Sequence, residues 1–119
     1  MVLVDTSIWV SHLRKGNPHL ETLLMDGEVI CHPFIIGELA CGHIKNRKEI
    51  LSLLQALPMA ETAEHQEVLH FLEHNLLMGK GLGYIDVHLL ASALLTEIPL
   101  WTSDRKLKVA SSELNASYR

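Results

Sequence analysis

The sequence has few cysteines, no long apolar run and no leader-like segment at its start. Of its 119 residues only Cys31 and Cys41 are cysteine, which is too few and too widely spaced for a zinc knuckle or a disulfide framework. No stretch reaches the roughly 18 uncharged apolar residues that a membrane-spanning helix needs. The residues before Asp5 lack the positive segment and cleavage site of a signal peptide. These absences predict a cytoplasmic protein without a membrane partner, whose cysteines are reduced core residues.

The chain also lacks the excess of positive charge that is usual in nucleic-acid-binding proteins. Its formal net charge is −4, with 48% hydrophobic and 20% charged residues. These proportions are those of an ordinary globular protein. A chain of this length can bury one core but not two, so we expect a single domain over residues 1–119.

Short apolar runs alternate along the chain with longer stretches in which apolar residues recur at helical spacing. This alternation is typical of an α/β domain with a mostly parallel sheet. In such sheets ligands bind beyond the carboxyl ends of the strands, where we expect Asp5 and Asp104 to lie. The predicted strands are at about 2–4, 28–31, 57–60 and 98–102, and the predicted helices at about 6–13, 19–25, 33–42, 45–56, 61–77, 84–96 and from 104 onward.

Four acidic residues stand alone in segments that otherwise suit the protein interior. An isolated carboxylate costs several kcal/mol to bury unless it is paired or bound to a metal ion. For any one of the four, a helix cap or a solvated edge position is a sufficient explanation. For all four together, the simplest explanation is that they converge and that a cation neutralises them. Asp5 is the only charged residue of residues 1–11, Glu38 of 29–44 and Asp86 of 81–96, and Asp104 ends the strand predicted at 98–102.

Clustered carboxylates are hard oxygen ligands of the kind that bind Mg²⁺ or Mn²⁺. Such ions activate a water molecule and stabilise the attacking and leaving oxygens in phosphodiester cleavage. We therefore expect all four acids to be catalytic. Asp5, Asp86 and Asp104 would hold the metal directly or through water, and Glu38 would complete the site or orient the attacking water.

Basic residues follow these acids along the chain. Without the four acids, ten acidic residues remain against ten basic ones, so the metal-loaded protein would be about neutral. A rim of positive charge around the site would hold an RNA backbone, although a solvated helix end explains each basic run equally well. Seven of the ten Lys and Arg residues lie close to a proposed ligand: Lys45, Arg47, Lys48, Lys80, Arg105, Lys106 and Lys108.

Four segments around these acids resemble the PIN-domain nucleases, and specifically the VapC-type toxins of bacterial toxin–antitoxin pairs. The resemblance implies a three-layer α/β/α sandwich, Mg²⁺- or Mn²⁺-dependent endoribonuclease activity, an RNA substrate, inhibition by a cognate antitoxin and assembly as a homodimer. The four acids match the family's acidic quartet, Thr6 and Ser103 match hydroxyl positions beside it, and Leu107 stands where many members carry an aromatic residue. The matching segments are Val4-Asp5-Thr6-Ser7, Gly37-Glu38-Leu39-Ala40-Cys41-Gly42, Asp86-Val87-His88-Leu89-Leu90-Ala91-Ser92-Ala93 and Trp101-Thr102-Ser103-Asp104-Arg105.

Two other functions are compatible with parts of the sequence. A PIN fold that binds RNA or a protein partner without cutting it is the main alternative, although such a domain need not keep four costly acids. His70 and His74 fit the H-x-x-E-H pattern of some zinc peptidases, but we expect them on a solvated helix face. We expect His88 on a helix surface, and Trp101 in the core, with base stacking as its alternative role.

Overall fold

Three short parallel strands form the sheet of this protein, which a computed structural model describes over residues 1–119. The strand order is β2-β1-β3, so the first strand is central. Leu3 of β1 lies in register with Ile30 of β2 on one side and with Leu100 of β3 on the other. The elements are β1 (Val2–Val4), α1 (Thr6–Lys15), α2 (Pro18–Met25), β2 (Val29–Ile30), α3 (Pro33–Ala40), α4 (Arg47–Gln55), α5 (His65–His74), α6 (Tyr84–Thr96), β3 (Leu100–Trp101) and α7 (Arg105–Glu113).

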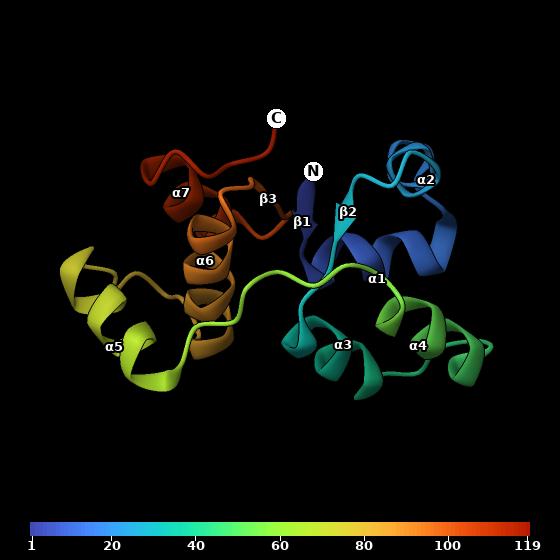
Figure 1. Ribbon diagram of the computed structural model, residues 1–119, viewed down its shortest axis with the longest axis horizontal. Helices are drawn as coiled ribbons and strands as arrows, with labels where there is room; N and C mark the ends of the chain where they lie inside the picture. The colour runs from blue at the N-terminus through green and yellow to red at the C-terminus, as the bar shows by residue number, and fades with distance from the viewer.

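Helices cover both sides of the sheet, with α5, α6 and α7 on one side and α1 to α4 on the other (Figure 1). All of β1 is buried, since its residues pack against helices on both faces. The core is one continuous cluster of 24 buried residues drawn from the strands and from most of the helices. The three-layer α/β/α sandwich expected from the sequence is confirmed, and every strand pair in its sheet is parallel.

Helix α6 runs through the interior of the molecule. Its residues 87–93 are all buried, because this stretch is apolar around most of the helix circumference. The sequence interpretation that placed His88 on a helix surface is therefore wrong, since its side chain is 3% exposed. The expectation for the cysteines holds for Cys31, which is buried, and fails for Cys41, which is exposed just after α3.

Two elements are shorter in the structure than the sequence predicted. The strand expected at 57–60 is reduced to a single parallel bridge between Met59 and Cys31. The helix expected at 61–77 begins only at His65, where the side chain of Glu67 accepts a 2.9 Å hydrogen bond from the backbone N–H of Glu64. It ends at His74, before the predicted residue 77, and Leu76 beyond it has a positive φ and is exposed. No helix of the structure is long and apolar enough to cross a membrane.

Candidate active site

The topology of the sheet brings Asp5 and Asp104 to the same edge. From β1 the chain crosses to β2 on one side, and later returns to β3 on the other side of β1. A parallel sheet whose connections diverge in this way has a crevice at the carboxyl ends of the two strands concerned. Asp5 directly follows β1, and Asp104 lies three residues after the end of β3. Both acids therefore lie at the point where this fold accommodates ligands.

Asp5 is buried and held by a network of hydroxyl groups. Its Oδ2 accepts hydrogen bonds from Ser7 Oγ and from Thr102 Oγ1, both at 2.8 Å. The same oxygen caps α1 by accepting from the backbone N–H of Ser7 at 3.4 Å. With a side chain only 6% exposed, a carboxylate needs such donors to offset its lost hydration. The network fixes Asp5 at the carboxyl end of β1.

Glu38 reaches the same region from α3. Its Oε1 accepts a 2.7 Å hydrogen bond from Thr6 Oγ1, and Thr6 is the residue next to Asp5 in the chain. Asp5, not Thr6, is the residue that caps α1. The hydroxyl of Thr6 is therefore available to Glu38, and it fixes the carboxylate of Glu38 beside the first helix.

Asp86 lies in the first turn of α6, where its Oδ2 accepts a 2.9 Å hydrogen bond from the backbone N–H of Gly83. Burial raises the pKa of Asp86 above its usual value, the bond from Gly83 opposes this, and the negative charges of Asp5 and Asp104 raise the pKa further. Like charges shift a pKa in this way only at short range. Asp5 and Asp104 are therefore both near enough to influence Asp86, although the three acids come from separate parts of the chain.

Asp104 is exposed and caps α7, since its Oδ1 accepts a 2.9 Å hydrogen bond from the backbone N–H of Leu107. Its own backbone N–H donates to Thr102 Oγ1 at 3.0 Å, and this hydroxyl donates to Asp5. One threonine therefore connects two of the acids. Leu107, which departs from the aromatic residue of the family pattern, is fully buried beneath this turn.

The four carboxylates share one feature of their hydrogen bonding. Each uses a single oxygen to accept bonds from the protein: Oδ2 of Asp5, Oε1 of Glu38, Oδ2 of Asp86 and Oδ1 of Asp104. The second oxygen of each accepts no protein hydrogen bond. One oxygen thus fixes the side chain, and the other remains available to a ligand.

Oxygen-only donor sets of this kind suit Mg²⁺ or Mn²⁺, which keep several water molecules when they bind to carboxylates. No three His, Cys, Asp or Glu side chains lie close enough in this structure to hold one ion between them directly. A cation at this site would therefore have to contact some of the acids through water.

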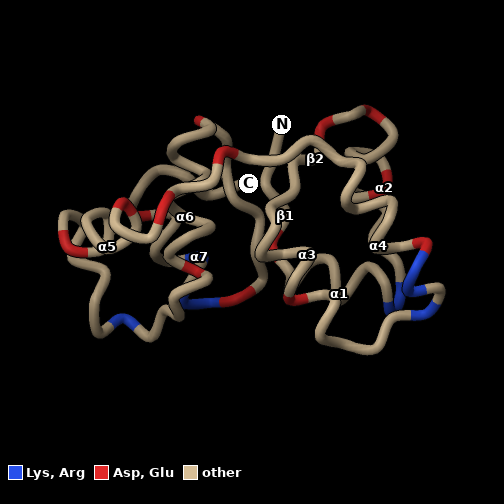
Figure 2. Tube along the Cα trace, turned by 60° about the horizontal axis from the view of Figure 1, so that its bottom comes forward, with Lys and Arg blue, Asp and Glu red and all other residues tan.

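The Lys and Arg residues gather mainly at the end of the molecule around α4, with others near α7 (Figure 2). Two of those expected to contact RNA have protein partners. Arg47 donates to the backbone carbonyls of Ala40, the last residue of α3, and of Gly42. Lys80 forms a 3.2 Å ion pair with Glu113. Both side chains therefore take part in contacts within the protein, as the alternative explanation for the basic residues predicted.

Two hydroxyl groups of the site were not predicted from the sequence. Thr102 and Ser7 make the contacts with Asp5, whereas Ser103 contributes only its backbone N–H, which donates to Ser7 Oγ at 3.0 Å. The signal that could have identified Thr102 is its position directly after β3, level with Asp5 after β1. Adjacent parallel strands bring such positions together.

Known proteins resemble this chain in both sequence and fold. Residues 2–112 match the PIN domain family. Ribonuclease VapC32 of Mycobacterium tuberculosis, in strains CDC 1551 and H37Rv, is 46% identical over 114 residues, which cover 95% of this chain and 92% of that protein. The crystal structure of PAE2754 from Pyrobaculum aerophilum has the same fold, with a TM-score of 0.62 and 19% identity over 92% of this chain and 78% of that one. The chain belongs to the PIN domain family, and its resemblance to VapC32 places it among the VapC-type members.

Proposed function

We propose that this protein is a VapC-type endoribonuclease that hydrolyses RNA phosphodiester bonds with the help of Mg²⁺ or Mn²⁺. Asp5, Asp86 and Asp104 hold the metal, directly or through water, and Glu38 completes the site or orients the attacking water. The observation that carries the proposal is the shared hydrogen bonding of the four acids, each of which is fixed by one oxygen and leaves the other unbonded. The 46% identity to a ribonuclease supports RNA as the substrate.

The residues of the chain have distinct tasks in this reaction. The metal, when bound, supplies an activated water molecule and stabilises the charge that develops on the phosphodiester oxygens. Thr102 and Ser7 hold the carboxylate of Asp5 in place, and Thr6 does the same for Glu38. A carboxylate fixed in this way loses no rotamer freedom when the ligand binds. The exposed Lys and Arg residues near the site attract the RNA backbone.

We also propose that the protein is the toxin of a toxin–antitoxin pair and is inhibited by a cognate antitoxin. We expect it to be a homodimer in the cytoplasm. Its resemblance to VapC32 supports these partners. Light scattering of the purified protein measures the oligomeric state. Co-expression with the product of the adjacent gene, followed by a cleavage assay, tests inhibition.

The central experiment is cleavage of a structured RNA by the purified protein with EDTA, Mg²⁺ or Mn²⁺. We expect cutting only with a divalent ion, and we expect Asp5→Asn and Asp86→Asn to abolish it while both variants remain folded. Asp26→Asn is the matched control, because Asp26 is exposed at the end of α2 and should leave the rate unchanged. Wild-type rates in either site variant would show that the proposed site is wrong. RNA binding without cleavage under every condition would favour the non-catalytic alternative.

A further inference from the structure

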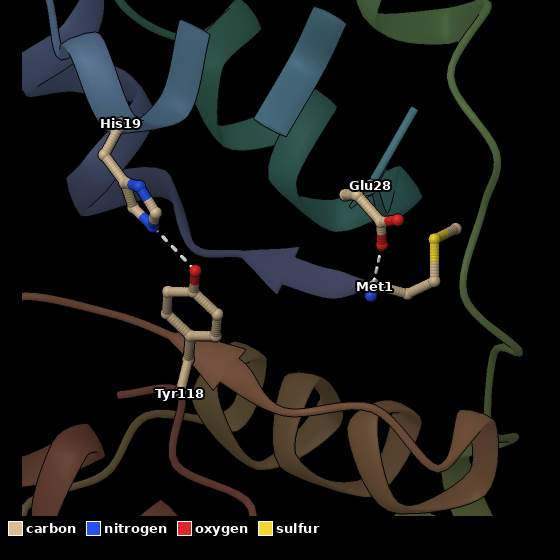
Figure 3. A network of polar contacts seen from close by, with 4 residues as sticks. All are labelled: Met1, His19, Glu28 and Tyr118. Atoms are coloured by element: carbon tan, nitrogen blue, oxygen red, sulfur yellow. Dashed lines mark hydrogen bonds and ion pairs between the residues drawn. The ribbon is translucent and has the colours of Figure 1, made fainter. Parts of the chain in front are cut away.

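Three aromatic rings from distant parts of the chain meet beside the sheet. His19 lies in the first turn of α2, Trp101 is the last residue of β3, and Tyr118 lies in the segment after α7. The rings of His19 and Tyr118 are stacked, with centroids 5.8 Å apart and planes inclined by 24°. Trp101 lies 5.3 Å from His19 and 5.4 Å from Tyr118. His19 Nε2 and the Tyr118 hydroxyl share a 2.6 Å hydrogen bond, and Figure 3 shows the two side chains pointing toward each other.

These rings line a cavity of about 360 Å³, a size within the range of small-molecule sites. His19 is exposed, while Trp101 and Tyr118 are half-buried and pack against the core, so all three rings are at least partly accessible to solvent. Trp101, which the sequence predicted within the core, thus lies at its edge. We call this cavity the aromatic pocket. Its walls are His19, Trp101, Thr102, Lys108, Ser117, Tyr118 and Arg119.

Charge and position both connect the aromatic pocket with the candidate active site. The cationic side chains of Lys108 and Arg119 lie on its wall, and no acidic residue does. Lys108 is one turn of α7 beyond Asp104. Thr102, also on the wall, donates the hydrogen bond to Asp5. The aromatic pocket and the proposed metal ligand Asp5 therefore share a contact with the same residue, Thr102.

Aromatic rings combined with cationic side chains are the means by which proteins bind single-stranded nucleic acids, because every base offers a π-face and every phosphate a negative charge. We propose that the aromatic pocket binds one unpaired nucleotide of the RNA substrate, beside the bond that is cut. The base stacks against the ring cluster, and Lys108 and Arg119 hold the phosphate. This inference rests on the proposed function, since it takes RNA as the substrate.

The binding experiment does not depend on catalysis. The chain has two tryptophans, and Trp9 is buried with no hydrogen-bond partner for its Nε1, so Trp9→Phe removes it without breaking a hydrogen bond. In this background Trp101 is the only tryptophan, and its fluorescence reports on the pocket. With EDTA present, uridine and adenosine 5′-monophosphates should quench it saturably. Ribose 5-phosphate, which has the phosphate but no base, should not.

Variants separate stacking from charge. Tyr118→Ala should weaken quenching at least about fivefold, the lower end for loss of one base–aromatic contact. Tyr118→Phe keeps the ring but not the hydroxyl that bonds His19, and it should bind nearly as well as wild type. A thermal melt of each variant checks that it is folded. Lys108→Gln should weaken binding and reduce its dependence on salt. His70→Ala, on the exposed face of α5, is the control and should change nothing.

The cleavage assay supplies the second readout. Tyr118→Ala should raise KM by a similar factor with little change in kcat, because the pocket contributes binding that is the same in the ground and transition states. Equal quenching by ribose 5-phosphate would reveal an anion site without stacking and would overturn the proposal. So would RNA cleavage with an unchanged KM in Tyr118→Ala. If nucleotides quench the fluorescence but the protein cuts no RNA with any divalent ion, the proposed function is refuted. The nucleotide-binding pocket would still be supported by the quenching.

Discussion

The hydroxyl of Thr102 donates a 2.8 Å hydrogen bond to the carboxylate of Asp5, although 97 residues separate them in the chain. The bond joins the carboxyl ends of β1 and β3, which are neighbours in the sheet. It therefore couples the position of a proposed metal ligand directly to the pairing of two strands.

Thr102→Val tests this coupling, since valine has nearly the shape of threonine but no hydroxyl. Asp5 would keep only its bonds from Ser7. We expect the free energy of unfolding to fall by about 1–3 kcal/mol, the cost of leaving a buried polar group with fewer partners, and RNA cleavage to slow. Urea denaturation and a cleavage assay measure the two effects. Thr102→Ser restores the donor and should recover most of both, and equal losses in the two variants would argue against the hydrogen bond as the cause.

Asp86→Asn should make the metal-free protein more stable at pH 7. Because burial and the charges of Asp5 and Asp104 raise the pKa of Asp86, the native state binds the proton more tightly than the unfolded chain does. Stability from this group is therefore lost as pH rises from the usual carboxyl value through the raised one. The amide oxygen of asparagine can still accept the bond from Gly83, so the cap is kept.

Thermal melts of both proteins, in EDTA and in Mg²⁺, check this prediction. Mg²⁺ at a hundredfold excess over its Kd should stabilise the wild type by about 2.7 kcal/mol and the Asp86→Asn variant much less. A variant that melts below wild type in EDTA and gains as much from Mg²⁺ would show Asp86 to be a structural acid outside the metal site.

The buried side chain of His32 should make the stability of the fold depend on pH in the acidic range. His32 is fully buried, and its Nδ1 accepts the backbone N–H of Phe34 at the start of α3 while Nε2 bonds Ser92. Burial, and to a smaller extent the charge of His88, lowers the pKa of His32 from 6.5 to about 4. The unfolded chain thus binds this proton more tightly, so stability should fall as pH drops from about 6.5 toward 4.

His32→Asn removes the titrating ring and keeps a side chain that can cap α3. The slope of stability against pH between 6.5 and 4 should be smaller in this variant than in wild type. His43→Asn, at an exposed position, serves as the comparison and should retain the wild-type slope. Identical slopes in all three proteins would rule out His32 as the source.

The double variant His70→Ala, His74→Ala should cut RNA at the wild-type rate with the same metal dependence. Both histidines are exposed on α5, with their rings stacked 6.2 Å apart, and neither belongs to the hydroxyl and carboxylate network. Metal analysis of the purified proteins completes the test. Stoichiometric zinc in wild type that disappears in the double variant would revive the zinc-peptidase alternative.

Much of this architecture could be predicted because it depends on local patterns. Alternating apolar runs predicted the parallel sheet, which the structure confirms. The metal site formed by four isolated acids stays a prediction, although Asp5 and Asp104 both influence Asp86. The start of α5 was misplaced because residues 61–64 have acceptable helix propensity, while the hydrogen bond from the Glu64 backbone N–H to the Glu67 side chain marks where the helix begins. His88 was misjudged because burial of a single polar residue depends on the whole helix around it. Thr102 was missed because its role depends on strand pairing, which no local pattern encodes.

Three helices begin at the candidate active site: α1 is capped by Asp5, α7 is capped by Asp104, and Asp86 lies in the first turn of α6. Each helix amino terminus carries roughly half a positive charge. The backbone itself thus offsets part of the negative charge that the acids would otherwise concentrate there. This partial compensation lowers the electrostatic cost of folding without a cation. We therefore expect the protein to be folded both with and without a metal ion.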